Sequence, residues 1–315
     1  MASGLFLKME RIIMKKIKNL KILLSRILMI ASQFVPYRIR VAISRTPLLR
    51  SIMGKFLNFF TLPSLSVVEI TAGPLIGFRL EVDLWKERWH WLGIHEPEVF
   101  SAFQKIVSNG IVVYDVGAAL GSHSLVLARL CGPKGLVYAF EPDTYWFSRL
   151  IRNLELNSVK NVKTLQLAVS DISGKVYFGR PSETEFWRLI EEKKEGWEVM
   201  EISSISLDDF CNSNPRPQLL KIDVEGGEAR VLLGAKKILE QHRPIIICEI
   251  HGLDPAQQVL GILQKYNYSN FYLENNCSEV TFGNVSSIPI SHHILACPKE
   301  NLSILYKLML LKKNL

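Results

Sequence analysis

The chain has 315 residues, of which 48% are hydrophobic, and a formal net charge of +8, so it can bury the core of one large domain or slightly more. Residues 1–50 hold eleven Lys or Arg and one acidic residue, a net charge of +10, which leaves −2 for the other 265 residues. This distribution argues against a nucleic-acid groove across the main body and indicates a basic N-terminal appendage.

Residues 1–50 are expected to form a basic, apolar helical arm. Apolar residues recur at steps of three and four, a helical stripe, at Ile13, Ile17, Leu20, Leu24, Ile27 and Ala31. The longest uncharged run, residues 27–37, has 11 residues, whereas a membrane span needs about 18 or more. A signal peptide fits poorly because Arg26 interrupts the apolar region. The arm therefore either makes a peripheral contact through residues 1–35 with the inner face of an anionic membrane, or packs on the body or a second subunit.

Two shorter segments flank the main domain, which we place at residues 111–300. Residues 51–110 read as a mixed lead-in subdomain with strands near 66–70 and 77–83 and a helix near 96–107. Residues 301–315 form an apolar and basic tail with the composition of the arm. That similarity favours the membrane alternative.

The five cysteines are widely spaced and form no CxxC pair. An odd number without framework spacing is typical of reduced thiols. We therefore expect a cytoplasmic protein, with the arm as its point of membrane contact.

From residue 111 onward, strand and helix patterns alternate. Strands are predicted at residues 111–117, 135–142 and 162–171, and helices at 118–132 and 143–158. Such alternation predicts an α/β fold with a parallel sheet between helices. Ligands of these sheets bind beyond the carboxyl ends of the strands, so the residues at those ends are the candidates for a site.

The first strand–helix turn reads "DVGAALG", with Gly117 and Gly121 at its two ends and Asp115 just before it. A dinucleotide-binding turn needs a middle glycine to admit the pyrophosphate, and this turn has none. Glu141 lies at the next strand end, where a carboxylate can bind ribose hydroxyls. These features favour S-adenosylmethionine, which has no phosphates, over NAD, the alternative cofactor.

A second group of polar residues follows the predicted strand 218–223. Asp223 ends this strand, Glu225 follows, and the next strand, 244–252, ends in Glu249 and His251. Neighbouring strand ends would bring these four side chains together. His251 has the pKa class of a general base, and Asp223 or Glu249 could orient it or act as bases themselves.

Three further interpretations concern the charged residues of this segment. The carboxylates with the imidazole would also suit Mg²⁺, but their spacing matches no known metal signature, so no metal is favoured. We expect Glu228 to be a helix N-terminal charge worth about 0.3–1 kcal/mol. Lys221 is expected to face solvent.

These motifs resemble the FkbM family of S-adenosylmethionine-dependent methyltransferases. The similarity runs through "EPEVF", "YDVGAALGSHSLVLA", "VYAFEPD", "LQLAVSDISGKVYF", "LLKIDVEGGEARVLLGA", "IIICEIHG" and "HHILA", about residues 90–297. It implies a class I methyltransferase fold, with a seven-stranded sheet whose last strand is antiparallel, and methyl transfer to oxygen. It also implies cofactor contacts in three places: the methionine end at Asp115, Gly117, Ala118 and Gly121, the ribose at Glu141 and Pro142, and the adenine along Ala168 to Asp171.

Two features depart from the family pattern. The family's turn usually carries Asn where this chain has Ala119, so one side-chain hydrogen bond to the cofactor would be missing. Residues 181–202 look like a variable insert.

The sequence therefore predicts an S-adenosylmethionine-dependent O-methyltransferase that acts on a hydroxyl of a sugar, glycolipid or related small molecule, and not on nucleic acid. The alternative is a non-catalytic, membrane-associated scaffold that retains the fold, which Ala119 and the apolar basic termini favour.

Overall fold

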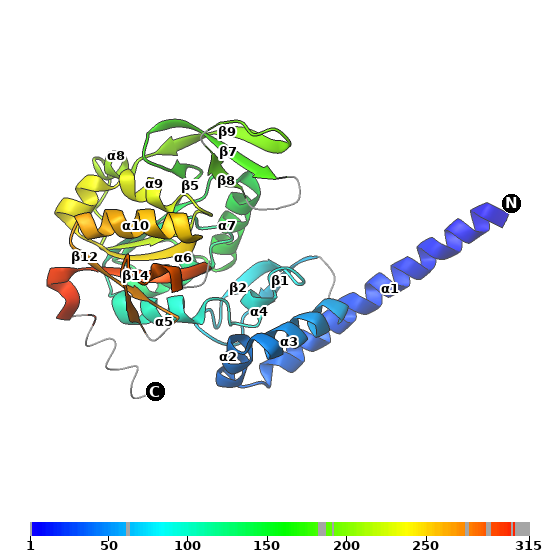
Figure 1. Ribbon diagram of the computed structural model, residues 1–315. Coiled ribbons are helices and arrows are strands. Elements are labelled where there is room, and N and C mark those ends of the chain that lie inside the picture. The colour runs from blue at the N-terminus through cyan, green and yellow to red at the C-terminus, as the bar shows by residue number, and fades with distance from the viewer. Residues whose placement is uncertain are drawn as a thin grey trace. The chain divides into compact units, whose positions relative to one another are not determined.

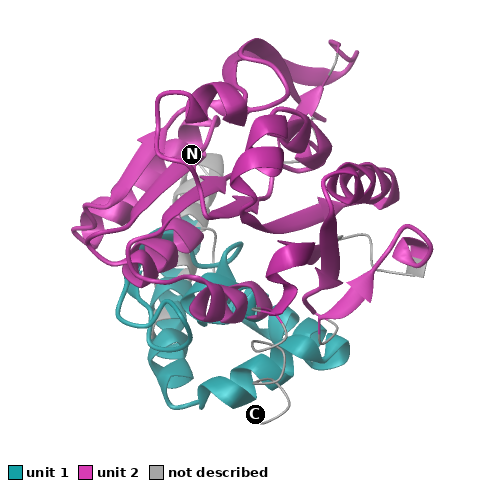
Figure 2. Ribbon diagram, turned by 90° about the vertical axis from the view of Figure 1, so that its left-hand side faces the viewer, with its two compact units in different colours: residues 1–97 teal, residues 98–315 magenta. Residues whose placement is uncertain are grey.

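The computed structural model describes residues 2–60, 64–181, 187–190, 192–274, 277–287, 291–303 and 305. They form two compact units, Met1–Pro97 and Glu98–Leu315 (Figure 2). The division lies inside the predicted lead-in subdomain of residues 51–110. Most of the predicted tail, residues 304 and 306–315, lies outside the described residues.

The first unit contains the predicted helical arm, whose helical structure is confirmed. Arg40 is buried, and its guanidinium donates hydrogen bonds to the carbonyls of Val35 at 2.8 Å and Leu92 at 2.9 Å. Its helices and its one antiparallel strand pair are α1 (Ala2–Gln33), α2 (Tyr37–Arg45), α3 (Pro47–Phe60), β1 (Leu65–Glu69), β2 (Arg79–Asp83) and α4 (Arg88–Trp91).

Among the described residues, none of the helices is by itself both long and apolar enough to cross a membrane. Met14–Gln33 and Tyr37–Arg45 meet the length and composition criteria only as a pair, bent by 111° at the break between them.

The second unit is built on an eight-stranded sheet of order β13-β12-β14-β11-β10-β3-β4-β5. Strands β5, β4, β3, β10 and β11 are parallel, whereas β14 runs antiparallel to both of its neighbours. The predicted α/β fold with an antiparallel last strand is confirmed, with β13 as an additional edge strand. The strands are β3 (Val112–Val116), β4 (Leu136–Phe140), β5 (Val162–Leu165), β10 (Leu219–Ile222), β11 (Ile245–His251), β12 (Tyr268–Tyr272), β13 (Ser278–Val280) and β14 (Ser291–Pro298).

Helices cover both faces of this sheet because its strands are apolar on both sides. On one face, α9 and α10 lie together (Figure 1) and pack with α8 on an aromatic and aliphatic core. Asp115 points to the other face, where it binds a serine of α6. The helices of this unit are α5 (Pro97–Ile106), α6 (Ser122–Cys131), α7 (Thr144–Leu156), α8 (Leu207–Cys211), α9 (Glu228–Leu233), α10 (Leu253–Lys265), the π-helix η1 (Ile238–His242) and the 3-10 helices η2 (Val285–Ser287) and η3 (Lys299–Asn301).

Two predicted elements are divided in the structure. The predicted strand 162–171 leaves the central sheet after β5, and β6 (Ala168–Val169) pairs instead with β9 of a second sheet. The helix for which Glu228 was predicted as an N-terminal charge is interrupted between α9 and η1. At Gly234 a β-carbon would lie 2.1 Å from the carbonyl oxygen of Ser170, so the backbone approach there requires glycine.

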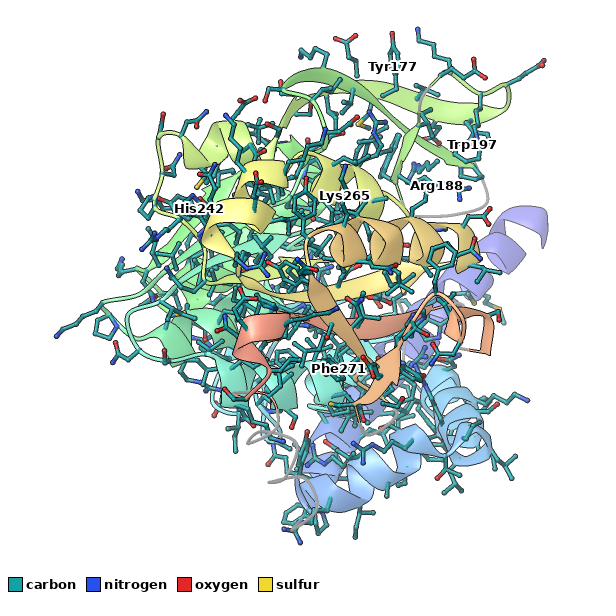
Figure 3. The ribbon with its side chains drawn as sticks, turned by 60° about the vertical axis from the view of Figure 1, so that its left-hand side comes forward. Tyr177, Arg188, Trp197, His242, Lys265 and Phe271 are labelled. Carbon is teal, nitrogen blue, oxygen red and sulfur yellow. The ribbon has the colours of Figure 1, made fainter. Side chains whose placement is uncertain are left out.

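The predicted insert, residues 181–202, contributes β8 and most of β9 to a second sheet of order β6-β9-β7-β8. On one face of this sheet, Val176 and Phe178 pack against Ala168. Tyr177, Arg188 and Trp197 are labelled in Figure 3, and the guanidinium of Arg188 lies 4.5 Å from the centroid of the Trp197 ring. Its strands besides β6 are β7 (Gly174–Pro181), β8 (Arg188–Ile190) and β9 (Trp197–Ile205).

Replacement of Phe210 by alanine should destabilise the second unit. The Phe210 ring lies 5.0–5.3 Å from the rings of Tyr114, Tyr138 and Phe140, and its loss leaves a cavity that costs about 3–5 kcal/mol. Urea denaturation measures this change. The control Phe282→Ala removes a ring that is 54% exposed and should change the free energy of unfolding by no more than about 0.5 kcal/mol. Equal effects of the two substitutions would contradict the placement of Phe210.

Candidate cofactor and acceptor site

The candidate site lies at the carboxyl ends of β4, β3, β10 and β11, which are consecutive neighbours in the sheet. The register pairs Asp115 of β3 with Lys221 of β10, and Glu249 of β11 with His293 of β14. Residues far apart in the chain therefore lie side by side, on the face of the sheet that α6 covers.

Asp115 and Lys221 form the buried centre of the site. Asp115 is fully buried, and its Oδ2 accepts a hydrogen bond of 2.5 Å from Ser124 Oγ. Its Oδ1 lies 3.6 Å from Lys221 Nζ and has no hydrogen-bond partner. Lys221 donates to the carbonyl of Gly117 at 2.8 Å and to Asp223 Oδ2 at 3.3 Å. The expectation that Lys221 faces solvent is wrong, because β10 is buried on both faces.

Gly117 allows the turn after β3 to approach the end of β10. Its φ is +79°, and a β-carbon there would lie 1.7 Å from the carbonyl oxygen of Asp223. Gly121 packs closely against α7, since a β-carbon at that position would lie 2.6 Å from Leu150 Cδ1. Ala118, between them, is buried.

Glu141 is held by two backbone amides at the end of β4. Its Oε2 accepts from Ala119 at 2.8 Å, and its Oε1 accepts from Asp143 at 2.9 Å. Ala119 has a φ of +45°, a left-handed conformation that asparagine adopts more readily than alanine. Burial raises the pKa of Glu141 to about 7, although the two amide hydrogen bonds oppose this shift.

A narrow apolar hollow opens beside Gly117. It is lined by strand ends and loops of the central sheet and by the second sheet, at Val116, Gly117, Phe140, Pro142, Leu167, Ala168, Val169, Phe178, Leu189, Val224 and Gly227. Asp171, predicted to border the adenine, accepts hydrogen bonds from Ser170 at 2.8 Å and from Arg230 at 2.7 Å.

These residues fit S-adenosylmethionine. An apolar hollow suits an adenine ring, and Glu141 has lone pairs beyond those used by its two amides. The Oδ1 atom of Asp115 is a buried acceptor without a hydrogen bond, which suits the ammonium end of the cofactor. Pro142 and Ala168, both predicted as cofactor contacts, line the hollow.

His251 lies at the centre of a second cluster, formed by the predicted acidic residues. Its Nδ1 is 2.8 Å from Glu228 Oε1, and its Nε2 faces three further carboxylates. The oxygen atoms nearest to Nε2 belong to Glu249 at 3.5 Å, Glu225 at 3.6 Å and Asp223 at 3.9 Å. The four residues predicted as catalytic are thus brought together.

The charges around His251 change its expected role. Burial lowers its pKa, but hydrogen bonds and charge interactions with Glu228 and Glu249 outweigh burial and raise the pKa to about 11. The surrounding carboxylates therefore favour the protonated imidazole, which makes His251 a less favourable general base than the sequence suggested. Burial and the neighbouring acids, opposed by His251, raise the pKa of Glu225, which makes Glu225 a better base than an exposed carboxylate.

Glu228, His293 and Glu274 also belong to this cluster, and the sequence pattern did not identify their role. Glu228 is the first residue of α9, as predicted, but its side chain is fully buried. His293 Nε2 lies 3.4 Å from Glu249 Oε2, and its Nδ1 lies 2.5 Å from Glu274 Oε1. The position of Glu249 and His293 on paired strands is the signal that could have located them.

Comparison with known proteins gives consistent matches. Residues 115–269 match the family described as methyltransferase FkbM domain. The hexuronic acid methyltransferase AglP of Haloferax volcanii is 33% identical over 181 residues, which cover 56% of this chain and 72% of that protein. The methyltransferase sdnD of Sordaria araneosa is 30% identical over 171 residues, 44% of this chain and 64% of that protein.

Among solved structures, the methyltransferase FkbM of Methylobacillus flagellatus is 16% identical. The match covers 84% of this chain and 62% of that chain, with a TM-score of 0.42.

Cofactor affinity should depend on the ionisation of Glu141. The ionised carboxylate accepts both amide hydrogen bonds and keeps lone pairs for ribose hydroxyls, whereas its protonated form loses an acceptor. With a pKa of about 7, affinity for S-adenosylmethionine should fall as the pH is lowered from about 8 to about 5.5. Calorimetric titration at several pH values measures this.

The variant Glu141→Gln provides the comparison. Its amide group cannot accept both backbone hydrogen bonds, so we expect a loss of about 1.5–3 kcal/mol, or about 10–100-fold in Kd, and a flat pH profile. A wild-type affinity that is constant over this range would exclude the carboxylate as a ribose ligand.

Proposed function

This chain belongs to the FkbM family of methyltransferases, as its motifs predicted, and from that premise we propose that it methylates a hydroxyl group of a sugar. It is an S-adenosylmethionine-dependent methyltransferase. A hexuronic acid is the first acceptor to test, because the relative from Haloferax volcanii is named for that substrate. Family membership favours this enzyme over the non-catalytic scaffold.

The observation that carries the proposal is the contact between the two halves of the site. Lys221 binds the carbonyl of Gly117 and the carboxylate of Asp223. The candidate cofactor turn and the acidic cluster are therefore held against each other, and a group bound in one half faces a group bound in the other. Alignment of this kind supplies a large part of the rate enhancement in a methyl transfer.

When bound, S-adenosylmethionine supplies a methyl group on a positively charged sulfur atom. Asp115 and Glu141 would hold its methionine and ribose parts, and the hollow beside Gly117 would hold its adenine. Pro142 and Ala168 line that hollow, so they would contact the adenine.

The acidic cluster provides the base for a hydroxyl acceptor. A neutral alcohol is a weak nucleophile, so removal of its proton during transfer is useful. Asp223 already accepts a hydrogen bond of 3.3 Å from Lys221. Glu225 has a raised pKa and a side chain that is 39% exposed, and it can therefore both accept a proton and be reached by an acceptor.

Incubation with S-adenosylmethionine labelled in its methyl group should transfer label to hexuronic acid glycosides. The variant Glu225→Gln should lower kcat by about 10²–10⁴-fold because it removes the base, while calorimetric affinity for the cofactor stays unchanged. Label found on nitrogen or carbon, or no loss of kcat in the variant, would contradict hydroxyl methylation with Glu225 as base. If label is transferred only to neutral sugars or glycolipids, hydroxyl methylation stands but the proposed hexuronic acid acceptor is wrong.

We further propose that the arm docks the protein on the inner face of an anionic membrane. Five apolar side chains of the arm are at least half exposed and recur at steps of three and four, namely Leu20, Leu23, Ile27, Ile30 and Phe34. Residues 1–50 carry a net charge of +10. An exposed apolar stripe with basic neighbours is typical of helices that lie in a membrane interface.

Sedimentation with vesicles tests the docking proposal. The full chain should bind vesicles that contain phosphatidylglycerol, bind neutral vesicles more weakly, and be released by salt. The substitution of Leu20, Ile27 and Phe34 together by glutamate should abolish binding. Phe282→Glu, which changes an exposed phenylalanine outside the arm, is the matched control. Vesicle binding that survives the triple substitution would refute the proposal.

A further inference from the structure

Three potential metal ligands converge at the ends of β10 and β11. Asp223, Glu249 and His251 each place a ligand atom so that these atoms lie within 4.8 Å of one another. Asp223 follows β10 directly, and the other two residues lie on β11, its parallel neighbour. The sheet itself therefore fixes the spacing of the three groups.

The imidazole of His251 is oriented as a metal-binding histidine is. Its Nδ1 lies 2.8 Å from Glu228 Oε1, which leaves Nε2 directed at Glu249 and Asp223. Histidine ligands of metals usually donate their second ring N–H to a carboxylate, which fixes the ring and its tautomer. Glu228 also accepts a hydrogen bond of 2.8 Å from the Gly226 amide, so the orienting carboxylate is itself held in place.

The same arrangement is repeated on the other side of Glu249. His293 Nε2 lies 3.4 Å from Glu249 Oε2, and its Nδ1 lies 2.5 Å from Glu274 Oε1. Glu249 thus stands between two imidazoles, each held through Nδ1 by a carboxylate. His293 is not one of the three ligand groups, but it holds the Glu249 carboxylate in place, as the supporting residues of a metal site do.

The cluster also carries more negative than positive charge. Asp223, Glu225, Glu228 and Glu249 surround the imidazole of His251. Other basic groups that reach them are Lys221, on Asp223, and His293, which lies between Glu249 and a fifth carboxylate, Glu274. Glu228 is fully buried, and its Oε2 has no hydrogen-bond partner. Buried carboxylates without full compensation are costly, and a divalent cation at this point would provide the missing positive charge.

We propose that Asp223, Glu249 and His251 bind a divalent metal ion, for which Mn²⁺ is the best match. Carboxylates are ligands of Mg²⁺, Ca²⁺ and Mn²⁺, and an imidazole shifts the preference toward a transition metal. His251 would bind through Nε2, and the proton now on that atom would pass to solvent. Three protein ligands leave coordination positions for water or an acceptor.

The role of the ion, though not its binding, rests on the methyl transfer proposed above. A metal-bound hydroxyl has a lowered pKa, so Glu225 could remove its proton more easily. The ion would also allow the carboxylate of an acidic sugar to enter a cluster that otherwise repels it. The ion therefore reconciles an anionic acceptor with an acidic site.

Mn²⁺ titration of the full chain, followed by electron paramagnetic resonance without cofactor or acceptor, tests the site. We expect one ion bound per chain. His251→Gln and Glu249→Gln should each weaken binding by at least about 100-fold, and Glu228→Gln, which removes only the orienting charge, by about 10–100-fold. Glu155→Gln alters an exposed acid on α7 and should leave the affinity unchanged.

The outcomes are separable from those of the methyltransferase assay. Failure of the wild-type chain to bind Mn²⁺ more tightly than the His251→Gln chain would overturn the proposal. Thermal unfolding of each variant, with and without Mn²⁺, shows whether the variant is folded. If Glu249→Gln does not fold, the Mn²⁺ affinity of Glu228→Gln tests the site in its place. Ion binding without methyl transfer would leave the site standing and refute the proposed reaction.

Discussion

One buried ammonium group joins the two halves of the site. Lys221 donates to the carbonyl of Gly117 and contacts Asp115 and Asp223, so the ends of β3 and β10 are held at one separation. The ammonium is almost fully removed from water, where its attraction to two carboxylates is stronger than at a surface. Its charge also permits Asp115 to remain buried. Lys221 therefore holds the candidate cofactor turn and the acidic cluster next to each other.

The parallel sheet explains why such distant residues meet. Lys221 lies opposite Asp115, and Glu249 lies opposite His293, through the register of neighbouring strands. Each pair needs only the correct strand order and the correct register, and both follow from apolar strands that are buried on two faces. Chemistry at the strand ends is then decided by a few polar positions, while the same strands supply the stability of the core.

Much of this arrangement could be predicted, and the parts that could not have physical causes. Strand ends such as Asp115 and Asp223 are recognisable because alternating patterns give the strands and their common direction. The partner strand of β11 is not readable from periodicity, so His293 was missed. Lys221 was predicted to face solvent because an isolated lysine is usually exposed, but β10 is buried on both faces and exposes no side chain to solvent. The charge state of His251 depends on four carboxylates at particular distances, which no spacing in the chain reveals.

The left-handed turn at Ala119 has one more consequence. Glu141 is anchored there by a main-chain amide, and a main-chain group persists whatever side chain the position carries. The family's usual asparagine can therefore be exchanged for alanine without loss of the carboxylate's anchor. The exchange removes the hydrogen bond expected from the asparagine side chain and leaves alanine in a less favourable left-handed conformation. A departure from the consensus at residue 119 is therefore compatible with an active enzyme.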